Sequence, residues 1–168
     1  RGFKREANRS LGAANLLFDL ELDLSTSFSG KDLLLTKLRT GSFNANNSLS
    51  GAPTNQSALN IAYSSNDAGE PVLSVDKLFY QFPIGSDFTV IIGPNVAQDD
   101  MFGMYPSLYG DDAILNYSAL AGAPLAYNQN QGAGAGLVWA GESGFSLPGN
   151  YSAINGKSDN TQQGGIAK

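Results

Sequence analysis

The chain has 168 residues, a net charge of −5, and neither His nor Cys. The absence of these residue types excludes Ser-His-Asp and Cys-His nucleophiles, ordinary zinc, haem and iron–sulfur sites, and disulfides. Charged residues make up 15% of the chain, against roughly 25% in an average soluble domain. The acidic balance argues against a nucleic-acid partner. We expect no metal, no cofactor and no enzymatic activity.

No apolar stretch approaches the roughly 18 consecutive residues that a membrane-spanning helix needs. The longest aliphatic runs are residues 33–35 and 90–92. The chain begins with Arg1 rather than Met and shows no secretory signal. We therefore expect a mature product or an internal fragment of a longer protein.

A hairpin of two strands is predicted after a basic segment, residues 1–15, to which we assign no function. Apolar residues occupy the even positions from Leu16 to Leu24, and acidic residues occupy three of the odd positions. Residues 34–41 alternate in the same way, with a period of two that is typical of strands. The polar faces of the two strands carry five charged residues, Asp19, Glu21, Asp23, Lys37 and Arg39.

Two registers of this hairpin keep its apolar and polar faces aligned. One places Asp19 opposite Arg39 and Glu21 opposite Lys37. The other places Glu21 opposite Arg39 and Asp23 opposite Lys37. Either register gives a cross-strand ladder of opposite charges, worth about 0.2–1 kcal/mol for each exposed pair.

Further strands are predicted along the chain. Residues 59–64 alternate, residues 72–82 form a return strand, and residues 88–93 follow a tight connection at 83–87. Pairing about Gly85 would set Phe82 beside Phe88, with the apolar faces on one side.

The alternation of apolar and polar residues stops between Pro94 and Gln131, which predicts a long loop. A loop of this length is usually functional. It contains four aspartates, Asp99, Asp100, Asp111 and Asp112. Residues 132–141 resume a strand that has Gly132, Gly134 and Gly136 on one face. Glycines weaken a strand unless something approaches its backbone closely. A weaker strand at 145–152, a polar loop at 154–163 and the beginning of another strand complete the chain.

Strands that are apolar on one face and polar on the other predict an all-β fold. A transmembrane β-barrel, with lipid outside and a wet lumen, has this pattern. A soluble antiparallel sandwich also has it. Two features favour an antiparallel transmembrane β-barrel, of which this chain supplies about seven strands. One is the low charge outside the alternating positions, and the other is the presence of aromatic residues near strand ends: Tyr80, Phe82, Phe88 and Trp139.

Two segments carry distinctive motifs, TSFSGKDLL at 26–34 followed by LRTGSF at 38–43, and VDKLFYQFPIG at 75–85. The first resembles the "SFTGKDLL…RLxxGNF" hairpin, and the second the "LDRLYYRFPLG" strand and turn, of cyanobacterial outer-membrane porins of the carbohydrate-porin (OprB-like) superfamily. The resemblance covers roughly residues 16–147. Family members have more strands than this chain, so the resemblance implies an internal fragment.

The resemblance implies a passive channel of the bacterial outer membrane for small hydrophilic solutes, such as carbohydrates, ions or iron. Outer-membrane lipid and a homotrimer of the full-length protein are the implied partners. On this interpretation all of residues 1–168 belong to the barrel: hairpins at 16–93, a constriction loop at 94–131, and further strands and a loop at 132–168.

Each set of candidate residues then has a role. The five charged residues of the first hairpin would line the pore, and the four aspartates would form an acidic constriction favouring cations. The glycines Gly132, Gly134 and Gly136 would leave room for the constriction loop, residues 94–131, to lie against the inner wall of the barrel.

Two other interpretations compete with the channel. The first is a secreted β-sandwich that binds glycans through loops rich in Tyr and Asn. The second is a glycosidase built on the paired aspartates. The glycosidase is disfavoured because adjacent aspartates on a strand or loop point apart.

Overall fold

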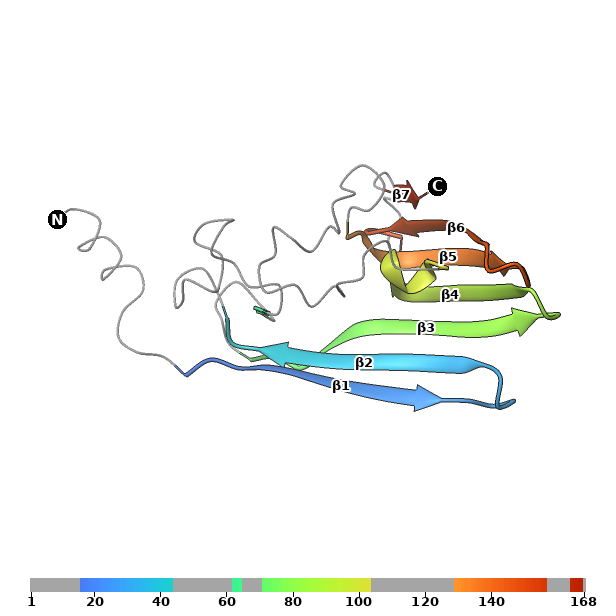
Figure 1. Cartoon of the computed structure of the whole chain (residues 1–168). Helices are drawn as coiled ribbons and strands as arrows, with labels where there is room; N and C mark the ends of the chain where they lie inside the picture. Colours follow the sequence, from blue (N-terminus) through green and yellow to red (C-terminus); the bar gives the residue numbers. More distant parts are fainter. Residues whose placement is uncertain (1–15, 44–61, 65–70, 104–128, 157–163, 168) are drawn as a thin grey trace. The chain divides into compact units, whose positions relative to one another are not determined.

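The computed structural model describes residues 16–43, 62–64, 71–103, 129–156 and 164–167 (Figure 1). These residues form β-strands and one 3-10 turn, and they contain no α-helix. The elements are β1 (Asp19–Thr26), β2 (Leu33–Gly41), β3 (Ser74–Ile84), β4 (Phe88–Ala97), η2 (Asp99–Met101), β5 (Gln131–Ala140), β6 (Ser146–Ala153) and β7 (Gly164–Ala167). No helix in this part of the chain is long and apolar enough to cross a membrane.

The strands form one sheet in the order β1-β2-β3-β4-β5-β6, with the short β7 paired to β6. The pairs from β3 to β7 are antiparallel. The prediction of an all-β, antiparallel fold is therefore confirmed. Of the strand predicted at 59–64 the structure describes only residues 62–64, where Ser64 forms an isolated bridge with Ser42.

The chain divides into two compact units, and strands β1, β2 and β3 contribute to both, β3 through Ser74 alone. The described residues of the first unit are 16–22, 38–43, 62–64 and 71–74. Those of the second unit are 23–37, 75–103, 129–156 and 164–167. The second unit contains the whole of β4, β5 and β6.

Glycines with left-handed backbone make two of the short turns. Gly30 has φ of 77° between β1 and β2, and Gly85 has φ of 65° between β3 and β4. The predicted register about Gly85 is wrong by two residues, because Phe82 pairs with Val90 and Ile84 pairs with Phe88. Gly85 occupies the first of three turn positions rather than the central one, since its positive φ begins the reversal of the chain.

Registers in the second unit define its two faces, because residues directly opposite each other in antiparallel strands point to the same side. We call one the apolar face; its members are Tyr80, Phe82, Ile84, Phe88, Val90, Ile92, Ala135, Leu137, Trp139, Leu147 and Tyr151. We call the other the packed face; its members are Lys77, Phe79, Gln81, Ile91, Gly134, Gly136, Val138, Asn150 and Ser152. A bulge in β4 at Gly93–Pro94 lies opposite Phe79, where proline has no ladder hydrogen bond to donate.

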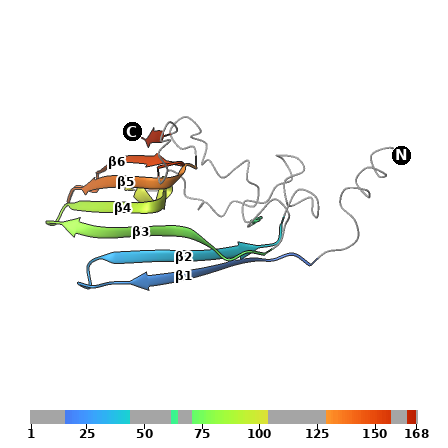
Figure 2. The ribbon, with the colours of Figure 1, turned by 180° about the vertical axis from the view of Figure 1, so that it is seen from behind.

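The core of the second unit lies on the packed face. It consists of Phe79, Ile91, Val96, Met101 and Val138, with Leu35 packed against them. Met101 comes from η2, which contacts β4, β5 and β6. Figure 1 shows η2 in front of β4 and β5, and Figure 2 shows the same strands from behind, with η2 beyond them.

The apolar face is exposed in the described part of the chain. Ile92 is 52% exposed, Leu137 is 45% exposed and Leu147 is 70% exposed, whereas Ile91 on the packed face is 2% exposed. Strand β1 also exposes its leucines, with Leu20 at 57% and Leu22 at 52%. The exposed face of the described strands therefore carries large apolar side chains, while a small apolar core is buried on the packed face.

Substitution of Gly136 tests the contact between η2 and the sheet. A Cβ atom at Gly136 would lie 2.8 Å from Cβ of Met101, so Gly136→Val should destabilise the protein by about 1–3 kcal/mol through overpacking. Gly149→Ala is the matched control, because a Cβ there meets no atom within 4 Å. Equilibrium unfolding in urea measures both variants, and equal midpoints for the two would contradict the packing.

Candidate functional site

Arg39 is the centre of a charged cluster in the first unit. Its Nε and Nη2 atoms donate to the two carboxylate oxygens of Asp19, at 2.9 and 2.5 Å. Nε also lies 3.1 Å from Oε1 of Glu21. The guanidinium carbon is 4.4 Å from the ring centroid of Tyr63, so a cation–π contact adds to the two ion pairs.

The hairpin register explains why Arg39 meets two carboxylates. The amide of Ser42 donates to the carbonyl of Phe18 at 3.0 Å, which places Glu21 directly opposite Arg39. Of the two registers considered from the sequence, this is the second. Asp19 is then the diagonal neighbour, which a long side chain can reach.

Lys37 and Asp23 form a looser pair in the second unit. The Nζ atom of Lys37 lies 3.7 Å from Oδ1 of Asp23, and the Asp23 side chain is 52% exposed. An exposed pair of this kind contributes about 0–1 kcal/mol. The five charged residues predicted to line a pore are thus paired with one another within each unit, as a ladder of opposite charges requires.

Lys77 joins strand β3 to η2. Its Nζ atom donates to Oδ1 of Asp100 at 2.8 Å, and both side chains are about five-sixths buried, at 15% and 16% exposed. The other carboxylate oxygen of Asp100 accepts from the amide of Ala97 at 3.0 Å. Asp100 is therefore paired with a cation, rather than a free member of an acidic ring.

The two ends of the predicted 94–131 loop meet at strand β6. The amide of Gln98 donates to the carbonyl of Asn130 at 2.9 Å. The Asn130 side-chain amide then donates to the carbonyl of Ser152 at 2.8 Å and to its hydroxyl at 3.2 Å. All three side chains are buried. Strand β4 extends to Ala97, so the loop begins four residues later than the sequence pattern predicts.

The three predicted glycines have different neighbours. Gly136 lies beneath Met101 of η2. A Cβ atom at Gly134 would lie against Val96 and the backbone of β6, and a Cβ atom at Gly132 would lie against the backbone of Ala153 and Ile154. Of the four aspartates, Asp99 and Asp100 lie in η2, while Asp111 and Asp112 lie outside the described residues.

Asn150 lies opposite Gly136 on the packed face. Its side-chain amide is buried, and neither its nitrogen nor its oxygen has a hydrogen-bond partner in the structure. Buried amides are usually paired, and the alternating pattern of β6 gives no signal that would have singled this residue out.

The turn between β1 and β2 has a hydrogen-bonded centre that the sequence analysis missed. The Asp32 carboxylate accepts from the amides of Phe28 and Ser29, and from the hydroxyls of Ser27, Ser29 and Tyr80. The Ser29 hydroxyl and then the Tyr80 hydroxyl are the main causes that hold the pKa of Asp32 well below its usual range. The closely spaced Ser27, Ser29, Gly30 and Asp32 are the signal that could have revealed this turn.

In the described ranges, no group of three or more Asp or Glu residues lies in a position to hold a metal ion. Comparison with known proteins finds no matching family model, no matching curated protein and no matching solved structure.

The pH dependence of stability tests the role of Asp32. Because the folded-state pKa of Asp32 is lowered from its ordinary value of 3.8, the carboxylate stabilises the fold above about pH 4. This contribution is lost as the pH falls toward the folded-state pKa. Asp32→Asn should lower the free energy of unfolding at neutral pH, and the difference from wild type should shrink below about pH 4.

Acid titration of urea unfolding measures this difference. Asp87→Asn is the control, since Asp87 lies in the next short turn and its carboxylate accepts from the neighbouring Ser86 hydroxyl. A difference between wild type and Asp32→Asn that stays constant down to about pH 2 would contradict the assignment.

Proposed function

We propose that this chain forms part of the wall of an outer-membrane porin, a water-filled channel for the passive diffusion of small hydrophilic solutes. The observation that carries the proposal is the exposed apolar face, opposite a face with charged and polar side chains. In a transmembrane barrel the first face contacts lipid and the second faces the lumen.

Strand dimensions support the proposal. A strand that crosses the hydrocarbon core at a tilt needs about 9–11 residues. Strands β2, β3, β4 and β5 have 9, 11, 10 and 10 residues, and β1 and β6 have 8 each.

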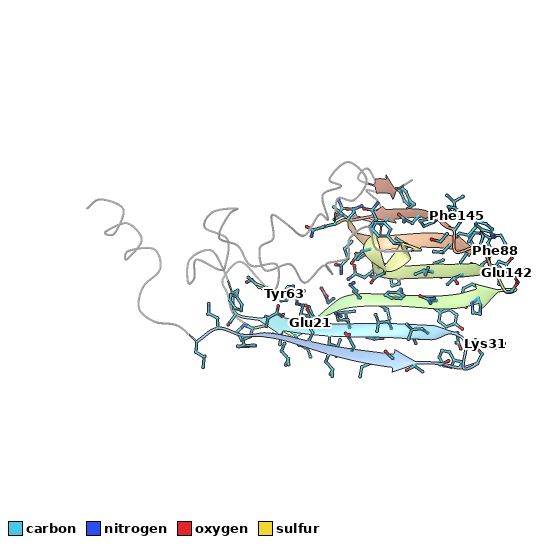
Figure 3. All side chains as sticks on the ribbon, viewed as in Figure 1. Glu21, Lys31, Tyr63, Phe88, Glu142 and Phe145 are labelled. Atoms are coloured by element: carbon cyan, nitrogen blue, oxygen red, sulfur yellow. The ribbon has the colours of Figure 1, made fainter. Side chains whose placement is uncertain are left out.

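Aromatic residues near the short turns also support it. On the apolar face, the rings of Tyr80 and Phe82 stack with centroids 5.4 Å apart, and Phe28 lies 6.3 Å from Tyr80. Figure 3 shows Phe88 and Phe145 at the end of the strands that carries the short turns, together with Glu142. Barrels place aromatic girdles of this kind at the membrane–water interface.

In this proposal the packed face lines the lumen of the channel. The Lys37–Asp23 pair would contribute to a field across the channel, and η2 would narrow the channel where the loop begins. We propose that the aspartates predicted for this segment, Asp99, Asp100, Asp111 and Asp112, give the narrow region its preference for cations, with Asp100 also paired to Lys77. Homotrimers in the bacterial outer membrane are the assembly that the resemblance to porins implies.

A glycan-binding sandwich would require a second sheet to cover the apolar face. The described strands belong to a single sheet, and their large apolar side chains are exposed on one side. The structure therefore offers no specific observation in favour of the sandwich.

Reconstitution of the full-length protein tests the channel. We expect the protein to need detergent, to migrate differently in gels before and after heating, and to give stepwise conductance in planar lipid bilayers. Protein heated before reconstitution is the control. A monodisperse protein in plain buffer that gives no conductance would contradict the proposal.

A further inference from the structure

At least three kinds of contact hold η2 on the packed face. Met101 fills the space above Gly136 of β5. Gln98, just before η2, donates its amide to Asn130 beside β5. Asp100 binds Lys77 of β3. Of these described contacts, the last alone comes from β3, and it alone is an ion pair.

Burial makes this ion pair sensitive to the loss of either partner. Both side chains are about five-sixths buried, so water and salt screen them less than they screen an exposed pair. Removing one partner leaves the other charge poorly solvated, and the remaining charge is then expected to move toward water. Since Asp100 belongs to η2, the whole turn would move with it.

We infer that Lys77 is a positioning residue for the proposed channel. By holding η2 toward β3, it fixes how far the start of the β4–β5 connection projects from the packed face, and so sets the largest solute that passes. The inference rests on the proposed function, because a size limit has meaning only if the packed face lines a channel.

Three substitutions separate this role from a general effect on folding. Lys77→Met removes the cation. Asp100→Asn removes the anion but keeps a side-chain oxygen that can accept from the amide of Ala97. The double exchange Lys77→Asp with Asp100→Lys restores an ion pair of reversed polarity.

Lys31→Met is the matched control. It removes a cation of the same unit, from the turn between β1 and β2, where the side chain is exposed. We expect this variant to leave the size limit unchanged.

The full-length protein is reconstituted into liposomes, and the swelling rate of the proteoliposomes is measured in solutions of sugars of increasing size. Heat-dependent gel migration checks that each variant is folded. Lys77→Met and Asp100→Asn should each raise the permeation of the larger sugars several-fold relative to a monosaccharide. The double exchange should restore the wild-type ratio.

The outcomes distinguish the two ideas. If the wild-type protein gives no swelling and no conductance, the proposed channel is wrong and the inference is wrong with it. If the wild-type channel conducts but the folded variants keep its size limit, Lys77 has no positioning role and the channel proposal stands. If both single variants fail to fold, the double exchange decides. A wild-type ratio of larger-sugar to monosaccharide permeation supports the inference, and a raised ratio overturns it.

Discussion

The alternation of side chains along antiparallel strands is the constraint on which the rest of this structure depends. Opposite residues point to the same side of the sheet, so the register that buries Ile91 and Val138 on the packed face necessarily exposes Ile92 and Leu137 on the other. A shift of one residue would reverse both faces. Apolar exposure on this scale is favourable only against another apolar medium. The proposed lipid contact supplies that medium.

The packed face combines two requirements that normally conflict. It holds charged side chains, which must be paired when they are removed from water, and it holds the small apolar core. The bare backbone of Gly136 lets η2 approach the sheet closely, so that Met101 is fully buried while Asp100 meets Lys77. Packing and ion pairing thus hold the same short turn.

The sequence predicted strands β1 to β6, the apolar face and the charged ladder, because these depend on a local period of two. The register after Gly85 was wrong because a positive φ can begin a turn as well as centre it. Lys77 received no role, since its partner Asp100 is 23 residues away and no periodic pattern links them. The hydrogen bonds of Asp32 depend in part on Tyr80, which lies 48 residues along the chain. Asp111 and Asp112 lie outside the described residues, so their role remains a prediction.

The most direct test of the account uses Trp139, the one tryptophan of this chain, which lies on the apolar face next to Phe88. Its fluorescence in the reconstituted protein should be quenched by phospholipids brominated on their acyl chains, and only weakly by a water-soluble quencher such as iodide. Any tryptophan elsewhere in a longer protein would be replaced by phenylalanine first. Quenching by iodide, with no effect of the brominated lipid, would show that this face meets water or protein and would contradict the account.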